Sequence, residues 1–338
     1  MLFFVVTGLW PHPCGSLAPS RLATLRRYSL SSPSRGLVGR RLYPLQPTRL
    51  SIPVLMASAA APAGAGRTIS RVVMAREQAE GDGARVRRSI GSRALPDLDP
   101  FLLLDEFRVT PPAGFPTHPH RGMQTVTYML SGAFQHEDNR GNAGIIGPGS
   151  LQWMLAGSGL QHSEMPATDG PNIGLQLWLT LPAADKMRPP DYQEVSAESV
   201  PTATSPDGAT RVRVLAGDAY GVMAAVITTS PILYLDVDID AGATATLPVP
   251  DDYAGFTYVL RGTGTFGVNG TAAEHGSCCL LADGETGALS ITAGPQGIRF
   301  VLVAGTPVRE PIFKHGPFVM NSREELRQAF KDYQNGLF

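Results

Sequence analysis

The sequence predicts an all-β protein made of two β domains of the same kind in tandem, followed by a short C-terminal helix. Short runs of Val, Ile, Leu, Thr and Tyr alternate with turn residues, and the 338-residue chain contains 37 Gly and 29 Pro. This turn-rich pattern is typical of a sandwich or a barrel. Residues 127–132 (TYMLSG) return 130 positions later as residues 257–262 (TYVLRG). A repeat at this spacing indicates that one β unit occurs twice.

The first 66 residues lie outside the fold that we predict. They contain seven Arg and many Ser, and the first acidic residue of the chain is Glu77. An Arg-rich, Ser-rich and acid-free segment is typical of an organellar transit peptide. The alternative is that the protein begins at Met56 and that the preceding residues are dispensable. Both readings stay open at this point.

The remaining chain divides into four segments. The first domain is expected at residues 67–200 and begins with a strand near Arg71, and the second is expected at residues 211–321. A polar stretch rich in turn residues, 201–210, is expected to link them. Ser322 and Glu325 have the spacing of a capping box, and apolar residues follow at helical spacing. We therefore expect a helix at residues 322–338.

Two pairs of potential metal ligands share the same spacing, His118 with His120 and His162 with Glu164. Residues two apart on a strand face the same way, so two such pairs on neighbouring strands would bring three imidazoles and one carboxylate together. Three of the seven His in the chain fall in this pattern. Nitrogen and oxygen ligands with open positions suit Fe(II), Mn(II) or Ni(II). We expect Fe(II), and the residues leave zinc, copper and other divalent metals open.

The repeat indicates that only the first domain binds metal. At the offset of 130, residues 118–120 correspond to residues 248–250, which are Pro-Val-Pro. At the offset of a second, weaker match, His162 and Glu164 correspond to the apolar residues Leu289 and Ile291. None of these side chains can coordinate a metal ion.

Other side chains are expected to surround the ion. Packing within their strands is the default expectation for Gln124 and Gln152, and a hydrogen bond to a metal-bound water or a substrate is the alternative. Four apolar residues would line a cavity beside the metal: Phe115, Trp153, Met154 and Met165. His136 precedes a turn, so we expect it at a solvated hairpin end, with a contact to a metal ligand as the alternative.

The composition excludes several classes of function. The 28 basic and 29 acidic residues nearly cancel, so no basic face for direct nucleic-acid binding is expected. The three Cys, one isolated and two adjacent, offer no disulfide framework and indicate a reducing compartment. No apolar run is long enough to span a bilayer. We expect a monomer without membrane association.

Six blocks of the sequence resemble the pirin family, in the family's order: residues 99–107, 118–122, 149–156, 162–166, 174–178 and 315–321. The resemblance runs from about residue 67 to the end. Pirins belong to the cupin superfamily, so it implies two tandem cupin β-barrels, also called double-stranded β-helices. It also implies one iron ion in the N-terminal barrel, held by His118, His120, His162 and Glu164, and a metal-free C-terminal barrel. Gln124 and Gln152 depart from the general cupin pattern, which has Glu and His there, so mechanisms of other cupins carry over only loosely.

The resemblance implies two kinds of function. The first is regulation: pirins are described as nuclear, iron-dependent cofactors of transcription regulators, and plant members as partners of a G-protein α subunit. The second is enzymatic, a quercetin 2,3-dioxygenase that cleaves a flavonol with O₂ and in which Glu164 would be a ligand and a base. We expect the regulatory role first. The implied location is the nucleus and cytoplasm, or the chloroplast or mitochondrion if residues 1–66 are a transit peptide.

Overall fold

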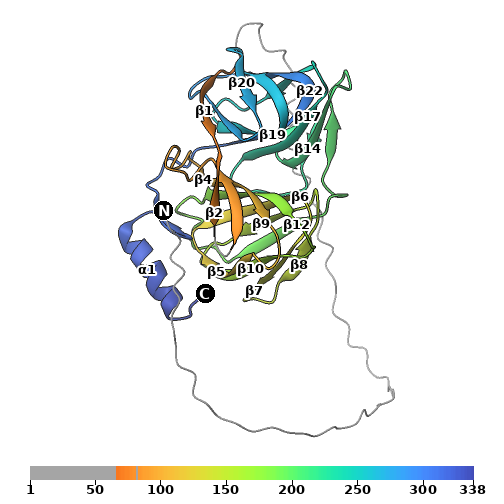
Figure 1. Cartoon of the computed structure of the whole chain (residues 1–338). Helices are drawn as coiled ribbons and strands as arrows, with labels where there is room; N and C mark the ends of the chain where they lie inside the picture. Colours follow the sequence, from red (N-terminus) through yellow and green to blue (C-terminus); the bar gives the residue numbers. More distant parts are fainter. Residues whose placement is uncertain (1–65, 81–82) are drawn as a thin grey trace, which may run out of the picture. The chain divides into compact units, whose positions relative to one another are not determined.

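The computed structural model describes residues 66–80 and 83–338 and shows two β-barrels and one helix (Figure 1). The expected targeting segment, residues 1–66, lies outside the described residues apart from Gly66. Within the described ranges, no helix combines the length and the apolar character that a bilayer crossing requires. The expectation of an all-β fold with a single closing helix is confirmed.

The first barrel consists of two antiparallel sheets. One has the strand order β12-β9-β6-β11-β4-β3-β2, and the other has the order β5-β10-β7-β8. The strands are β2 (Arg76–Glu80), β3 (Ala84–Arg88), β4 (Phe101–Val109), β5 (Phe115–His120), β6 (Met123–Ser131), β7 (Phe134–Asp138), β8 (Ala143–Ile146), β9 (Leu151–Leu155), β10 (Leu160–Pro166), β11 (Asn172–Thr180) and β12 (Asp191–Val195).

The second barrel is one nine-stranded sheet organised around the long strand β22, which pairs with β17, β18 and β19. Its order is β1-β21-β19-β22-β17-β14-β13, with β18 paired to β22 and β20 paired to β19. The strands are β1 (Ile69–Met74), β13 (Thr202–Thr204), β14 (Thr210–Ala216), β17 (Ile232–Ile239), β18 (Thr244–Pro248), β19 (Ala254–Phe266), β20 (Thr271–Glu274), β21 (Ser277–Leu281) and β22 (Ala288–Gly305). Two hairpins complete the set: β15 (Asp218–Ala219) with β16 (Val222–Met223), and β23 (Phe313–His315) with β24 (Phe318–Met320).

The sheets depart from the expected domain bounds at the start of the chain. Strand β1, expected to open the first domain, pairs with β21 of the second barrel, Val72 with Cys279 and Met74 with Ser277. Figure 1 shows β1 beside the strands of the second barrel. The hydrophobic pattern of a short strand does not say which sheet it joins, because any exposed sheet edge can accept it.

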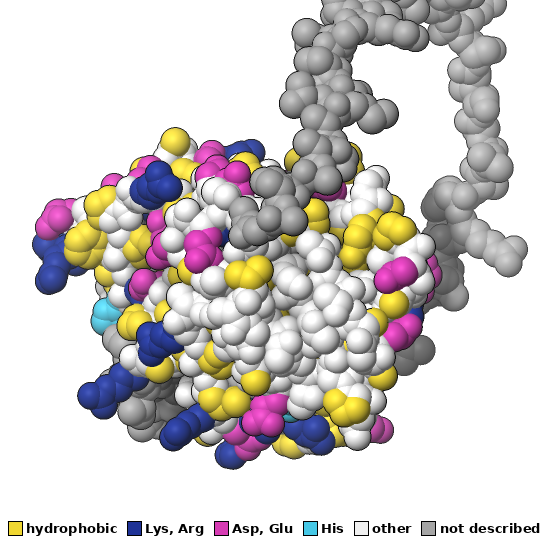
Figure 2. Space-filling view, turned by 90° about the horizontal axis from the view of Figure 1, so that it is seen from above, with side chains coloured by type: hydrophobic (Ala, Val, Ile, Leu, Met, Phe, Trp, Pro, Cys, Tyr) yellow, Lys and Arg dark blue, Asp and Glu magenta, His cyan; other side chains and the backbone are white. Residues whose placement is uncertain are grey.

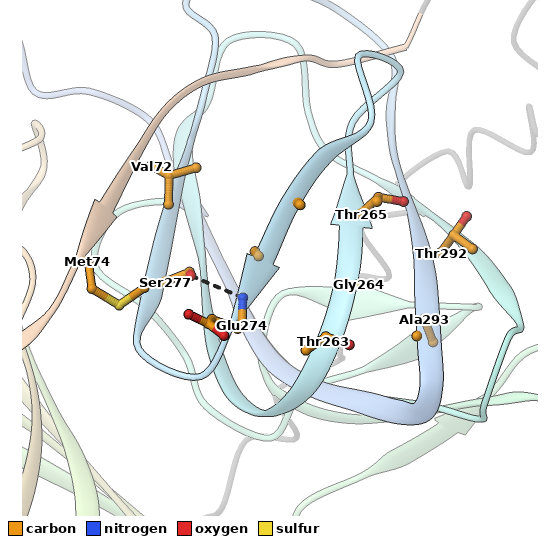
Figure 3. A pocket seen from close by; sticks show the side chains of 12 residues that line it. Val72, Met74, Thr263, Gly264, Thr265, Glu274, Ser277, Thr292 and Ala293 are labelled. Carbon is orange, nitrogen blue, oxygen red and sulfur yellow. Dashed lines mark hydrogen bonds between the residues drawn. The ribbon is translucent and has the colours of Figure 1, made fainter.

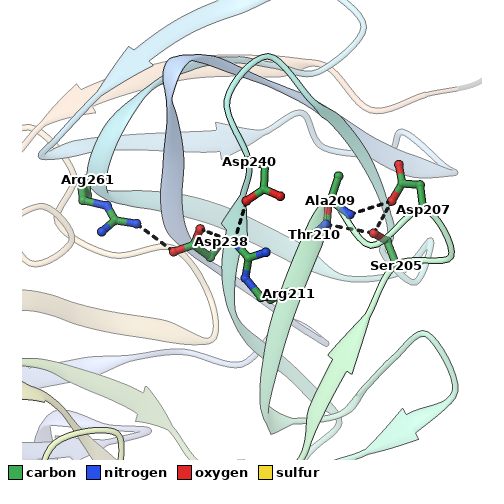
Figure 4. Close-up of polar contacts among 8 residues, drawn as sticks. All are labelled: Ser205, Asp207, Ala209, Thr210, Arg211, Asp238, Asp240 and Arg261. Carbon is green, nitrogen blue, oxygen red and sulfur yellow. Dashed lines mark hydrogen bonds and ion pairs between the residues drawn. The ribbon is translucent and has the colours of Figure 1, made fainter.

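The expected linker also carries structure. Strand β13 lies inside residues 201–210 and pairs with β14. The turn between the two strands is held by Asp207, which accepts hydrogen bonds from the Ser205 hydroxyl at 2.5 Å and from the Ala209 backbone N–H at 3.1 Å (Figure 4). Next to this turn, Arg211 forms ion pairs with Asp238 and Asp240. The polar composition therefore marks an ordered hairpin turn.

The C-terminal helix α1 (Arg323–Gln334) forms where the capping box predicted it, with the Ser322 hydroxyl accepting the backbone N–H of Glu325 at 3.2 Å. It packs against the first barrel (Figure 1). Arg121, which follows β5, forms an ion pair with Asp332 at 2.6 Å, and its guanidinium carbon lies 4.2 Å from the centre of the Phe338 ring. The last segment of the chain thus covers the end of a strand that carries predicted metal ligands.

Two tyrosine–carboxylate hydrogen bonds cross between the barrels. Tyr128 donates to Asp236 Oδ2 at 2.6 Å, and Tyr258 donates to Glu106 Oε2 at 2.7 Å. Both tyrosines and both carboxylates are related by the repeat offset of 130. They lie in or beside an apolar cluster that draws residues from both barrels. The duplicated units therefore face each other with an approximate two-fold relation.

The end of the second barrel seen from above carries mainly uncharged polar side chains and exposed backbone, with charged side chains along the margin (Figure 2). No continuous basic surface is visible on this face. This agrees with the near-zero charge balance of the chain.

Candidate metal centre

Three of the four predicted ligands come together in the first barrel. Strands β5 and β10 pair antiparallel, with His118 directly opposite His162 and His120 opposite Leu160. Each of the three histidines offers one ligand atom, and these atoms lie within 4.8 Å of one another. The Nε2 atoms of His118 and His162 are 3.1 Å apart. The spacing argument for these three residues is confirmed by the geometry.

The histidines have the protonation that a metal ion needs. Nδ1 of His118 lies 2.8 Å from the Pro116 carbonyl oxygen, and a hydrogen bond donated there leaves Nε2 with a free lone pair. Burial, and then the neighbouring His162 ring, lowers the pKa of His118 to about 4. Burial also lowers the pKa of His162 to about 4 and that of His120 well below its usual value. All three imidazoles are therefore neutral at pH 7.

This donor set fits a transition metal. Three neutral imidazole nitrogens suit Fe, Ni, Cu or Zn and not the hard ions Mg²⁺ and Ca²⁺, which prefer oxygen. The Nδ1 atoms of His120 and His162 are buried and have no hydrogen-bond partner among the described residues. The lone pairs that converge between the rings, such as those on Nε2 of His118 and His162, cost free energy when they are buried without a partner, and coordination to a metal would offset that cost.

Glu164 lies near this cluster but outside the group of closely spaced ligand atoms. Its side chain is 2% exposed. Oε1 accepts a hydrogen bond from the Thr127 hydroxyl at 2.7 Å, and Oε2 accepts one from Gln176 Nε2 at 3.0 Å. Its charge acts on His118, whose pKa it raises against the larger effect of burial. Its role as fourth ligand stays a prediction.

Strand register separates the other predicted site residues. Gln152 lies opposite Thr127, and Met154 lies opposite Thr125, so both face the side of the sheet where Thr127 contacts Glu164. Gln124 and Trp153 face the other side, where the Trp153 indole N–H donates to Gln124 Oε1 at 2.8 Å. Gln124 thus packs within its strand, as expected by default. The expectation that Trp153 lines a cavity beside the metal is wrong, because the alternation of the strand turns it toward the apolar cluster shared with the second barrel.

Phe115 and Met165 do not form a common wall with Met154. The Phe115 ring packs with Phe107 and Phe134, at centroid distances of 6.3 and 6.1 Å. Met165 follows Glu164 on β10, so it points to the opposite face of the strand. The predicted apolar cavity of four residues is not assembled by this structure.

Sequence reasoning missed three neighbours of the cluster: Thr127, Gln176 and Trp178. The Trp178 ring lies 5.2 Å from that of His120, edge to face. Gln176 and Trp178 alternate with Leu175, Leu177 and Leu179 along β11. This alternation could have indicated that Gln176 and Trp178 share one face of the strand, opposite the leucines. Thr127 could not be recognised from the sequence, because the second domain, which lacks the ligands, also has a threonine at the matching position, Thr257.

His136 is buried, so its expected place at a solvated hairpin end is wrong. It is 1% exposed, and its Nε2 lies 2.6 Å from Glu194 Oε1. On β7 it is directly opposite Glu164 of β10. The hairpin turn begins only after Asp138, and the barrel closes over the strand before it.

The second barrel has apolar residues at the matching places. Leu247 of β18 is opposite Leu289 of β22, and Ala245 is opposite Ile291, as His118 is opposite His162 in the first barrel. The residue that matches His118 is thus Leu247 and not Pro248. The sequence offset between the two barrels is therefore one residue shorter here than in the repeated hexapeptide. The conclusion still holds that, among the described residues, the second barrel has no group of metal ligands.

A cavity outside this site lies on the second barrel and contains none of the predicted ligands. Its volume is about 580 Å³, and it lies on the second barrel between β1 and the strands β19 to β22 (Figure 3). Thr, Ala and Gly line most of it, and Glu274 is its one ionisable side chain. It offers no set of convergent functional groups.

Comparison with known proteins identifies relatives along most of the chain. The family model described as Pirin matches residues 83–179, and that of the Pirin C-terminal cupin domain matches residues 234–338. A pirin-like protein from Solanum lycopersicum is 48% identical over 274 residues, which covers 80% of this chain and 92% of that protein. Pirin from Homo sapiens is 45% identical over 275 residues, with coverage of 80% and 94%.

Solved structures give the same picture. A structure titled quercetin 2,3-dioxygenase from Acinetobacter baumannii is 31% identical, with a TM-score of 0.75 and coverage of 80% of this chain and 98% of that one. A bacterial pirin from Escherichia coli, solved in complex with nickel(II), shares the fold at 20% identity and a TM-score of 0.58.

Proposed function

Because the chain belongs to the pirin family, we propose that it binds one iron ion in its first barrel and uses it to cleave a flavonol with O₂. The reaction would be that of a quercetin 2,3-dioxygenase. The observation that carries this proposal is the cluster of three neutral histidines at the paired ends of β5 and β10. The likeness to the A. baumannii dioxygenase over 98% of that chain supports it.

The residues around the cluster have definable tasks. His118, His120 and His162 would hold the ion, with Glu164 as the predicted fourth ligand. When bound, iron supplies the redox chemistry for the reaction with O₂. His118 is only half-buried, while His120 and His162 are each 1% exposed. We therefore place the approach of substrate on the His118 side.

Glu164 is the group best placed to move a proton. Hydrogen bonds from Thr127 and Gln176 fix its carboxylate in one orientation, as an effective general base requires. Its carboxylate would accept the proton of the flavonol hydroxyl, leaving the substrate as an anion. The Trp178 ring next to His120 would limit access of water on that side.

Turnover of quercetin tests this proposal. The purified chain, loaded with Fe(II), is mixed with quercetin and O₂, and the loss of flavonol absorbance is followed together with release of CO. We expect turnover by the unmodified chain and by His315→Ala, an exposed histidine outside the cluster, and none by His162→Ala. Absence of turnover in the loaded chain would refute the enzyme proposal. Turnover that survives His162→Ala would refute the assignment of the site.

One observation favours a second candidate, the iron-dependent regulator. Residues adjacent to the ligands contact the C-terminal segment: Arg121 pairs with Asp332 of α1, and Gln161 donates to the Phe338 carbonyl oxygen at 2.7 Å. Oxidation of Fe(II) to Fe(III) would add a charge beside these contacts. The expected partner, a transcription regulator or a G-protein α subunit, would then bind a surface that includes α1.

Hydrogen exchange distinguishes this candidate. We expect amide protection in α1 to differ between the Fe(II) and Fe(III) forms, and the difference to vanish in Arg121→Ala. Equal protection of α1 in both oxidation states would argue against regulation through this surface.

A further inference from the structure

The second barrel contains a cavity of about 280 Å³ at the end of β18. Strand β18 corresponds to β5 of the first barrel. In the first barrel β5 pairs with β10, which carries His162, and in the second barrel β18 pairs with β22, which carries the matching residue Leu289. Leu247 and Val249, which line the cavity, stand where the first barrel has His118 and His120. The cavity of the second barrel therefore lies at the positions that carry the histidines in the first barrel.

The inner wall of this cavity is apolar. Leu233 and Leu235 of β17 join Leu247 and Val249, and each of the four is at most 5% exposed. Dry cavities of about 150 Å³ already accept benzene, so this volume has room for one aromatic ring or a branched hydrocarbon of similar size. The wall offers no group that would bind a polar ligand core.

The mouth of the cavity is aromatic and negatively charged. Tyr220, Tyr253 and Asp218 line it, and Asp218 is the only charged residue among the lining residues. Burial raises the pKa of Tyr253, and the negative charges of Asp252 and Asp218 raise it further. Tyrosine faces beside carboxylates attract a cation and repel an anion.

The backbone at Tyr220 is unusual. Tyr220 and Gly221 form the two-residue turn of the β15–β16 hairpin, and Tyr220 has a φ of +47°. Asn or Gly normally occupies this position, since a bulky residue is strained there. The turn itself gives no reason for a tyrosine, whereas its ring lines the cavity mouth.

We propose that the second barrel binds a small primary amine with a hydrocarbon body the size of one aromatic ring. The hydrocarbon would occupy the cavity between Leu233 and Leu247. The ammonium group would stay at the mouth, between the Asp218 carboxylate and the rings of Tyr220 and Tyr253.

Binding of benzylamine to the full chain tests this proposal, with benzyl alcohol as the neutral probe and benzoate as the anionic one. Calorimetric titration should give one benzylamine site per chain, with a dissociation constant on the order of 1 mM as expected for so few atoms. Benzyl alcohol should bind several-fold more weakly, and benzoate should not bind. The result should be the same for the metal-free and the iron-loaded chain.

Variants locate the site. Asp218→Asn, at an exposed position, should weaken benzylamine about fivefold, as loss of an exposed ion pair does, and leave benzyl alcohol unchanged. Ala219→Phe should fill the cavity and abolish both, with an unchanged circular dichroism spectrum as the check of folding. Glu324→Gln, which removes an exposed charge on α1, should change neither.

Three results would overturn the proposal. One is the absence of saturable benzylamine binding to the unmodified chain. Another is binding that survives in both Asp218→Asn and Ala219→Phe. The third is binding that requires iron, which would place the amine in the first barrel.

Discussion

The paired hydrogen bonds between the barrels allow a quantitative prediction. Tyr128→Phe removes the hydroxyl that donates to Asp236, a carboxylate that is only 3% exposed. Arg299 still pairs with Asp236 at 2.7 Å, so the charge stays compensated and the loss is that of one hydrogen bond to a charged acceptor. Such a bond contributes roughly 1.5–3 kcal/mol. We expect the free energy of unfolding to fall by about 2 kcal/mol.

The corresponding substitution in the second barrel should lower the free energy of unfolding by a smaller amount. Tyr258→Phe removes the hydroxyl that donates to Glu106, whose side chain is 15% exposed and also contacts His275. Water can take the place of the lost donor there, so we expect a fall of about 1 kcal/mol. The two pairs share no partner, so the double variant should lose about the sum of the two effects.

Equilibrium unfolding in urea measures these differences, and Tyr234→Phe is a matched control. Tyr234 is fully buried in the same cluster, and its hydroxyl has no hydrogen-bond partner among the described residues. Removing a hydroxyl that is buried without a partner should leave stability unchanged or raise it slightly. Equal losses for Tyr128→Phe and Tyr234→Phe, or a larger loss for Tyr258→Phe, would refute the reasoning.

Three further predictions follow from the first barrel and the N-terminal segment. Arg121→Ala should lower the melting temperature and increase hydrogen exchange in α1, because it removes the ion pair with Asp332; unchanged exchange would contradict this. Burial lowers the pKa of Lys186 to about 8, so the unfolded chain binds more protons between about pH 8 and 10 and stability should rise with pH there, by up to about 1.4 kcal/mol per unit. In Lys186→Met this slope should be absent, and urea unfolding at pH 8 and 9.5 compares the two chains. Residues 1–66 fused to a fluorescent reporter should direct it to the chloroplast or mitochondrion if they are a transit peptide, and a diffuse reporter would contradict that reading.

The sequence was sufficient where a short pattern carried both the geometry and the chemistry. A spacing of two residues on a strand brings His118 and His120 to one face. The only further requirement was that the strand carrying His162 pairs with theirs, and the fold provides this pairing. The capping residues of α1 likewise act within a few positions of the chain. The hexapeptide repeat was long enough to show the duplication.

Other features depend on contacts that no local pattern encodes. The pairing of β1 with β21 is decided by which sheet edge is free, and β1 would form a strand in either barrel. The faces of Gln124 and Trp153 follow from register, where a shift of one residue exchanges inside and outside. Thr127 and Gln176 belong to the site because each donates a hydrogen bond to Glu164, and this contact depends on strand pairing that the sequence does not show.

Metal analysis of the purified chain tests the central claim most directly. After loading with Fe(II) and removal of unbound ions, elemental analysis should give close to one iron per chain. The triple variant His118→Ala/His120→Ala/His162→Ala should bind almost none and keep the circular dichroism spectrum of the unmodified chain. One tightly bound iron per chain in the folded triple variant would contradict the assignment of the metal centre to the first barrel.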